Sequence, residues 1–427
     1  MKKKEKKERK PNWKEYIASV EDIERYLDDR VMLRCNVVTH RIECREWSDE
    51  KGVENPWLPL GNRQVKTWWK ELSREKSVRL QDIQNVAESN YAPDYHPFRH
   101  YLEHLPPWDG TSDHILAMSM SVQVKGDTDK QLLFAQYLKK WLVAMVASWV
   151  DDNVVNNVIL VLIGPQGSYK TTWFNYLLPP ELRSYFYTKT NAQRMTKDDM
   201  LTLAQYGLVC CEELDTMRPQ ELNQLKAAVT MSSVNERAPY DRYPENRKHI
   251  ASFCGTGNNT QFLSDPTGNR RWLPFEIESI DSPREYPFEY AEIYAQAYAL
   301  YRQGFQYWFS QEEIQRLAAH NRQFETPRLE NELVQLYFRK PTGVEPGMFM
   351  SVARAMQIVS ANISQKLSAV YLGRALNESG FRRVKYNGVR GYIVVCRNGD
   401  EIHAAQQSMA MQAESEEGAL DSSGQYF

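Results

Sequence analysis

The sequence predicts an α/β protein with a parallel-sheet core, an N-terminal α+β and helical region, and a C-terminal winged-helix-like module. Apolar runs at residues 158–163, 207–211 and 250–254 lack the alternation of half-exposed strands, as is typical of strands buried on both faces. Segments with helical spacing separate these runs, which favours a parallel α/β arrangement. Near the C-terminus, two helical segments precede two strands joined by Asn387-Gly388, a strong hairpin signal.

The N-terminal part is predicted to be mixed and then helical. A helical piece near residues 20–27 precedes an extended run at residues 31–46, and a helix rich in Trp and Lys follows. Residues 131–150 carry apolar side chains at helical spacing on one broad face. These elements predict a small α+β appendage and a helical region ahead of the sheet.

After about Pro274 the sequence predicts a return to helix. Ser310 with Glu313 forms a capping-box pattern, which predicts a helix around residues 311–323. A further helix is expected to end near Phe338. The expected segments are a charged tail (1–12), an α+β appendage (13–90), a helical region (91–150), a P-loop core (151–280), a helical linker (281–340), the winged-helix-like module (341–397) and a disordered tail (398–427).

Composition excludes several classes of protein. The chain has 427 residues, a net charge of -2 and 42% hydrophobic residues, as expected for an ordinary globular protein. No apolar run approaches the roughly 20 residues that a membrane span requires. The cysteines show no paired spacing, which argues against a disulfide scaffold or a zinc ribbon. The charged first residues lack the apolar segment of a secretory signal, so we expect a cytoplasmic protein.

The clearest functional motif is GPQGSYKT at residues 164–171, between a predicted buried strand and a predicted helix. This is the context of a P-loop, in which backbone N–H groups and a helix N-terminus surround phosphate oxygens. Lys170 is expected to reach the β- and γ-phosphates, and Thr171 to hold Mg²⁺. We therefore expect ATP and Mg²⁺ as ligands. The residues expected to bind the nucleotide are Gly164, Gln166, Gly167, Ser168, Tyr169, Lys170, Thr171 and Thr172.

One position departs from the P-loop pattern. Tyr169 stands where the second glycine of G-x-x-x-x-G-K-[ST] belongs. A Cβ atom and a ring must therefore fit where a close approach is usual. The alternative interpretation of the whole segment is an unrelated turn between strand and helix.

Acidic residues follow the second apolar run. We expect Glu212 to help hold Mg²⁺ and Glu213 to act as the general base that polarises the attacking water. Such acids are often only solvated carboxylates at a strand end, but together with a P-loop they form a strong pattern.

The third apolar run ends in a polar group, and an arginine pair follows it. Asn258 is expected to hydrogen-bond the γ-phosphate or the attacking water; a plain Asn-rich turn is the alternative. Arg270 or Arg271 is expected to act as an arginine finger on a neighbouring subunit's nucleotide, and a simple surface pair is the alternative.

The order of these motifs resembles that of the superfamily 3 helicases of viruses and plasmids, and in particular the virulence-associated protein E family of phages and mobile elements. The resemblance covers about residues 95–277 and rests on the P-loop, the acids, Gly255 to Asn258 and the GNRR motif at residues 268–271. It implies an AAA+-like ATPase that assembles as a homo-oligomeric ring on single-stranded DNA and works with a primase or another replication protein.

Two basic segments are candidates for DNA contact. In superfamily 3 proteins a loop between the acidic and Asn-tipped strands grips DNA, and the matching segment here carries Arg237, Tyr240, Arg242 and Lys248. Cations neutralise phosphates while aromatic faces stack on bases; a solvated loop is the alternative. In the C-terminal hairpin, Arg382 and Arg383 belong to a basic wing, for which DNA contact and protein docking remain equally open.

Two functions follow from the sequence. The first is an ATP-dependent DNA helicase or translocase. The second is a nucleotide-gated DNA- or protein-binding regulatory module with weak or no hydrolysis, because Tyr169 disturbs the P-loop.

Overall fold

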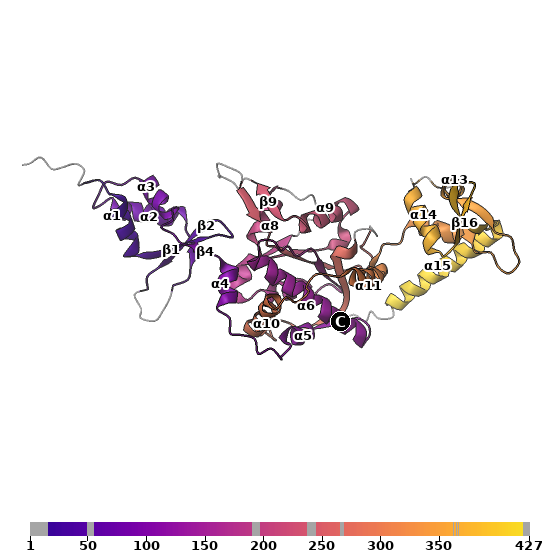
Figure 1. Cartoon of the computed structure of the whole chain (residues 1–427), viewed down its shortest axis with the longest axis horizontal. Coiled ribbons are helices and arrows are strands. Elements are labelled where there is room, and N and C mark those ends of the chain that lie inside the picture. The colour runs from indigo at the N-terminus through magenta and orange to yellow at the C-terminus, as the bar shows by residue number, and fades with distance from the viewer. Residues whose placement is uncertain are drawn as a thin grey trace, which may run out of the picture. The chain divides into compact units, whose positions relative to one another are not determined.

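The computed structural model describes residues 16–48, 55–189, 197–236, 245–264, 269–361, 363, 365 and 367–421 (Figure 1). The chain divides into two compact units, Met1–Glu325 and Thr326–Phe427.

The core of the first unit is a six-stranded sheet with the order β5-β12-β6-β11-β8-β7. Its strands are β5 (Val122–Val124), β6 (Ile159–Ile163), β7 (Phe186–Lys189), β8 (Leu208–Cys211), β11 (Ser252–Gly257) and β12 (Trp272–Ile280). All neighbours pair in parallel except β5, which is antiparallel to β12. The three apolar runs are thus confirmed as adjacent strands β6, β8 and β11, whose carboxyl ends meet at one edge of the sheet.

Strand β6 shows why these runs are continuously apolar. Leu160 and Leu162 belong to the hydrophobic core on one face, together with residues of α6 (Thr128–Val150) and α10 (Tyr290–Arg302). Ile159 and Val161 belong to the core on the other face, together with residues of α9 (Pro219–Val229). Because both faces are covered, every side chain of β6 is buried.

Two predicted helices are present: α6 includes residues 131–150, and α11 (Gln311–Asn321) ends two residues before the expected residue 323. Other helices between residues 97 and 325 are α4 (Pro97–Glu103), α5 (His114–Ser119), α7 (Lys170–Leu177), η2 (Pro180–Tyr185), α8 (Lys197–Gln205), η3 (Leu214–Thr216), η4 (Asn269–Arg271) and η5 (Arg322–Phe324). The predicted capping box of α11 is present: Ser310 Oγ accepts the Glu313 N–H (3.2 Å), and the Glu313 carboxylate accepts the Ser310 N–H (2.8 Å).

Strand β12 differs from the sequence-based expectation. The chain was expected to turn helical after about Pro274, but β12 continues through Pro274 to Ile280. A proline is tolerated there because β5 pairs with β12 only between Ile277 and Ile280. At Pro274 one side of the strand has no neighbour among the described strands, so the missing N–H breaks no ladder on that side.

The N-terminal appendage is α+β, as predicted. It contains α1 (Val20–Asp28), β1 (Val31–Asn36), β2 (Arg41–Glu46), β3 (Leu58–Pro59), α2 (Asn62–Leu72), α3 (Leu80–Ala87) and β4 (Asp94–Tyr95). Its sheet has the order β3-β2-β1-β4 and covers its own hydrophobic core, which includes Leu27, Trp68 and Ile83. Because β4 pairs with β1, the appendage extends beyond the expected boundary at residue 90.

The second unit contains the helices and hairpin that the sequence predicts. Its elements are α12 (Leu329–Tyr337), β13 (Phe338–Arg339), β14 (Met348–Ser351), α13 (Val352–Ser360), α14 (Ala369–Glu378), β15 (Arg382–Tyr386), β16 (Val389–Cys396) and α15 (Gly399–Asp421). Strands β15 and β16 pair antiparallel, and Asn387 (φ 47°) and Gly388 (φ 78°) form the turn between them. Positive φ at both positions is what a tight two-residue hairpin requires.

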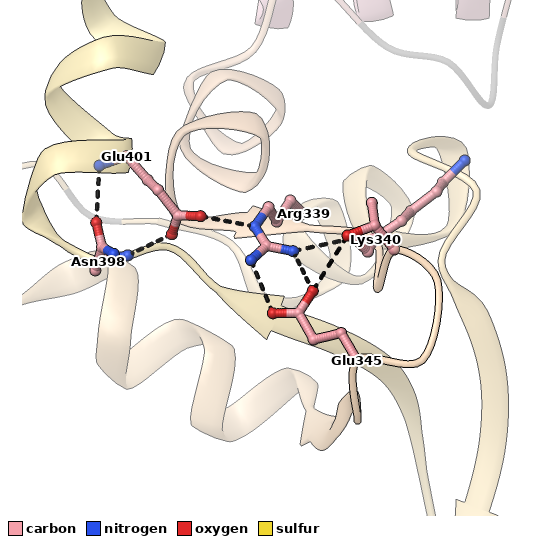
Figure 2. Close-up of polar contacts among 6 residues, drawn as sticks. Arg339, Lys340, Glu345, Asn398 and Glu401 are labelled. Atoms are coloured by element: carbon pink, nitrogen blue, oxygen red, sulfur yellow. Dashed lines mark hydrogen bonds and ion pairs between the residues drawn. The ribbon is translucent and has the colours of Figure 1, made fainter.

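Helix α15 replaces most of the tail that was expected to be disordered. Asn398 Oδ1 accepts the Glu401 N–H (2.9 Å) and Glu401 accepts the Asn398 N–H (2.8 Å), which caps the start of the helix. Arg339 joins Glu401 (2.9 Å) to Glu345 (2.6 Å) and so ties β13 to both the helix and the loop before β14 (Figure 2). The composition of residues 399–421 is rich in Ala, Gln, Met and Glu, which are strong helix formers.

Candidate functional site

The glycine loop connects the carboxyl end of β6 to the first turn of α7. Gly167 has φ 83°, a conformation that side chains disfavour, while no heavy atom would lie within 4 Å of a Cβ atom there. Glycine is therefore needed at this position for backbone freedom and not for space. The N-cap residue of α7 makes no side-chain capping bond. The first N–H groups of this helix have no intrahelical acceptors and can bind an anion.

Gly164 has a different role from the one expected. Its N–H donates to the Gly257 carbonyl (3.1 Å), so it is not free to bind phosphate. A Cβ atom at this position would lie 2.7 Å from Ile277 Cγ1. Gly164 thus allows β12 to approach the loop closely, and its contribution to the site is indirect.

Tyr169 adopts the backbone conformation that a glycine would supply. Its φ and ψ are 59° and 12°, in the left-handed region, and its side chain is 45% exposed. A left-handed residue with a Cβ costs about 1–2 kcal/mol. The loop therefore has local backbone strain at Tyr169, whose side chain is partly exposed and lines the cavity.

The ammonium of Lys170 lies inside the loop. The residue is 8% exposed. Its Nζ contacts the carbonyl oxygens of Gly164 (2.7 Å) and Pro165 (2.6 Å), Ser168 Oγ (3.2 Å) and Asn258 Oδ1 (3.4 Å). Burial lowers the pKa of Lys170, and the negative charge of Asp215 opposes that shift. The loop thus surrounds the Lys170 ammonium, and a bound anion would replace some of the oxygen atoms that now accept hydrogen bonds from it.

The residues expected to hold Mg²⁺ lie next to each other. Thr171 Oγ1 donates to Glu212 Oε1 (2.7 Å). Mg²⁺ prefers oxygen ligands and is usually bound by one or two carboxylates together with phosphates and water. Among the described residues, no cluster of three or more His, Cys, Asp or Glu side chains suits a metal ion. The Thr171 hydroxyl and the Glu212 carboxylate are oxygen ligands of the kind that Mg²⁺ prefers.

These side chains share one cavity of about 300 Å³. Its lining contains Gln166, Gly167, Ser168, Tyr169, Lys170, Thr171, Thr172, Glu212, Glu213, Thr256 and Asn258. Glu213 is exposed and has φ 54°, so the turn after β8 is also left-handed. Sequence reasoning gave no role to Thr256, although it belongs to the polar end of β11.

The arginine pair lies elsewhere. Trp272, which directly follows Arg270 and Arg271, pairs with Ile159 at the amino end of β6, whereas the loop follows Ile163 at the carboxyl end. The two positions are separated by the length of β6, about 16 Å at roughly 3.3 Å per residue. Arg270 and Arg271 instead line a separate cavity of about 270 Å³. Within one chain, neither arginine takes part in the loop cavity.

The predicted DNA-contact residues are distributed over both units. Arg237, Tyr240 and Arg242 lie outside the described residues, between β9 (Ser233–Glu236) and β10 (Glu245–Lys248), which pair as an antiparallel hairpin. Lys248 Nζ donates to the Asp152 carbonyl, and burial lowers the pKa of Lys248. The ammonium of Lys248 is therefore bonded within the fold. In the second unit, Arg382 and Arg383 are both exposed.

The sequence match identifies the family. A family model described as the virulence-associated protein E-like domain matches residues 102–326, more than half of the chain. The chain belongs to this family, which confirms the resemblance inferred from its motifs. No curated protein gives a significant match. The part of the chain that the structure describes contains no helix long and apolar enough to cross a bilayer.

Among solved structures, the matches to this chain include two of low similarity. They are the apo structure of the NrS-1 C terminal region (305-718), at 11% identity, and the A form apo structure of the same region, at 12% identity. In both comparisons the match covers 87% of this chain and 98% of the other, with a TM-score of 0.47.

Proposed function

We propose that this chain is a magnesium-dependent P-loop ATPase that moves on single-stranded DNA in the replication system of a phage or mobile element. The observation that carries the proposal is the single cavity at the carboxyl edge of the sheet. It joins the glycine loop, Lys170, the Thr171–Glu212 pair, Glu213 and Asn258. Ligand sites of open parallel α/β sheets lie at this edge.

Each side chain in the cavity has a role suited to its chemistry. The loop amides and Lys170 bind the phosphates, while Thr171 and Glu212 hold the magnesium ion. When bound, Mg²⁺ neutralises charge on the phosphates. Glu213 orients the attacking water and accepts its proton, because its carboxylate is exposed to the cavity and makes no hydrogen bond to a described residue. Asn258 donates a side-chain hydrogen bond to the γ-phosphate or to that water.

The left-handed conformation of Tyr169 supports hydrolysis over the regulatory alternative. That alternative depended on a tyrosine ring that disturbs the loop. The main chain at Tyr169 instead lies in the left-handed region that glycine adopts readily, and the residue is 45% exposed. The AAA+-like assembly, a homo-oligomeric ring with a primase or another replication protein as partner, is part of the same proposal and rests on family membership.

The hairpin of the winged-helix-like module is proposed to contact DNA phosphates. Lys385 pairs directly with Arg390 across the hairpin, and Arg383 lies on the same face two residues away. All three are exposed, and directly opposed like charges are unfavourable without an anion. Arg382 lies on the other face of the strand. We therefore favour Arg383 over Arg382 as the phosphate contact, with Lys385 and Arg390.

ATP hydrolysis with and without single-stranded oligonucleotide tests the proposal. We expect Mg²⁺-dependent hydrolysis that rises with added oligonucleotide, and a DNA-dependent ring by light scattering in the presence of an ATP analogue. If added oligonucleotide does not change the rate of ATP hydrolysis, the chain is an ATPase but does not move on DNA. Tight ATP binding with negligible hydrolysis would favour the regulatory module.

A further inference from the structure

Asp215 connects two parts of the cavity wall that lie far apart in the sequence. It belongs to η3, the short turn that follows Glu212 and Glu213. Its Oδ2 atom accepts the backbone N–H groups of Asn258 (3.2 Å) and Asn259 (3.0 Å). The turn after β8 is thereby tied to the turn after β11. Asn258 Oδ1 in turn lies 3.4 Å from Lys170 Nζ.

The second oxygen of Asp215 is unusual. Oδ1 is buried and has no hydrogen-bond partner among the described residues. Burying an unpaired carboxylate oxygen costs free energy, and such groups in native proteins call for an explanation such as a catalytic role. A Cβ atom at Gly257 would lie 3.2 Å from this oxygen, so glycine leaves room for the carboxylate. The carboxylate also raises the pKa of Lys170 against the effect of burial.

We propose that Asp215 is a positioning residue for hydrolysis: its two backbone hydrogen bonds fix the turn that presents the Asn258 carboxamide to the reacting end of the nucleotide. The inference rests on the proposed ATPase function and adds a residue to it. Asp215 need not touch the nucleotide, because it acts through Asn258. A free turn at Asn258 would sample several orientations, and hydrogen bonds that are not preorganised stabilise a transition state less well.

The test compares Asp215→Ala and Asp215→Asn with a matched control. Asp109→Ala is the control, because Asp109 Oδ1 also accepts two successive N–H groups, from Thr111 (2.8 Å) and Ser112 (2.9 Å), away from the cavity. We expect Asp215→Ala to lower kcat by about tenfold or more, while Kd for a non-hydrolysable ATP analogue changes by less than about threefold. Asp215→Asn keeps an oxygen for both amides and should retain most of kcat. Asp109→Ala should match the wild type.

A double-mutant cycle separates positioning from a general structural effect. Because Asp215 acts through Asn258, Asp215→Ala should cost no further activity in an Asn258→Ala background. Equal losses in both backgrounds would overturn the inference, as would wild-type kcat in Asp215→Ala. If Asp215→Ala does not fold, Asp215→Ser replaces it with the same outcomes, because serine is too short to reach both amides. The two failures are distinguishable. If the wild-type chain does not hydrolyse ATP, the proposed function is wrong; if the wild type hydrolyses ATP and Asp215→Ala does so equally fast, only the role of Asp215 is wrong.

Discussion

The two edges of the parallel sheet differ in how their charged groups are paired. At the carboxyl edge, Lys170 is surrounded by acceptors from its own loop, and Thr171 bonds Glu212. At the amino edge, Arg270 and Arg271 share a cavity with Trp308 and other uncharged residues, and no acidic side chain in the described part of the chain lines it. Burial and the charge of Arg270 lower the pKa of Arg271. The charged groups at the carboxyl edge are hydrogen-bonded within the site, whereas no described acidic residue lines the cavity of the two arginines.

Under the proposed function, this difference separates what one chain does alone from what it does with a neighbour. The proposed phosphate-binding, metal-binding and water-activating groups all line one cavity of a single chain. The same proposal assigns to Arg270 or Arg271 an anion from another molecule, the nucleotide of a neighbouring chain. In a ring, each chain would offer its loop cavity to one neighbour and its arginine pair to the other.

Lys170→Ala should abolish hydrolysis. Removing the ammonium from the loop takes away the main positive charge available to the phosphates, and we expect kcat to fall by at least about 10³-fold, with weaker ATP binding. Steady-state hydrolysis and analogue binding measure both effects. Lys125→Ala is the matched control, because Lys125 forms a surface ion pair with Glu276 and its side chain is 57% exposed. Near-normal hydrolysis in Lys170→Ala would place the nucleotide elsewhere.

The Arg270→Ala/Arg271→Ala double variant should bind ATP normally but lose about 10³-fold in kcat, as expected when an arginine finger is removed. Mixing this variant with a second inactive variant tests whether the arginines of one chain act on the nucleotide of another. If they do, a mixture with Lys170→Ala chains regains hydrolysis, because intact arginines then face an intact loop. A mixture as inactive as its components would refute action between chains. Arg316→Ala, at an exposed position on α11, should leave activity unchanged.

Glu213→Gln should keep nucleotide binding and lower kcat by about 10²-fold, the usual contribution of a general base. Glutamine has nearly the same shape, so the change removes proton acceptance and little else. Glu212→Gln serves for comparison: because Glu212 bonds Thr171, its loss should raise the Mg²⁺ concentration needed for half-maximal rate. If Glu213→Gln instead of Glu212→Gln raises the Mg²⁺ concentration needed for half-maximal rate, Glu213 is the metal ligand and Glu212 the general base.

The predictions from sequence were accurate where the signal is local. The buried strand β6, the capping box at Ser310 and the hairpin turn at Asn387 each depend on residues adjacent in the chain, and all three are present. Strand β12 was missed because Pro274 normally ends regular structure. The strand is tolerated only because of where β5 pairs, and that is a long-range property.

The site was predicted as a set of residues but not as a network. The motifs identified Lys170, Thr171, Glu212, Glu213 and Asn258, and the structure brings them into one cavity. The hydrogen bonds that Asp215 makes to a turn more than forty residues later along the chain leave no pattern in a single sequence. Likewise, the role of Gly164 depends on Ile277, which approaches it from another strand. Such contacts become visible only after the chain has folded.

Tyr169→Gly should have the smallest effect. The backbone at Tyr169 is already left-handed, so glycine relieves about 1–2 kcal/mol of strain. Glycine also adds roughly 0.5–1 kcal/mol of unfolded-state entropy, and the net change in stability should be small. Because the loop keeps its shape and all its phosphate contacts, kcat should change by less than about threefold. Tyr169→Ala, which keeps the strain but removes the ring, is the control. A Tyr169→Gly variant that hydrolyses ATP while the wild type does not would instead identify the tyrosine as an inhibitor of turnover and favour the regulatory module.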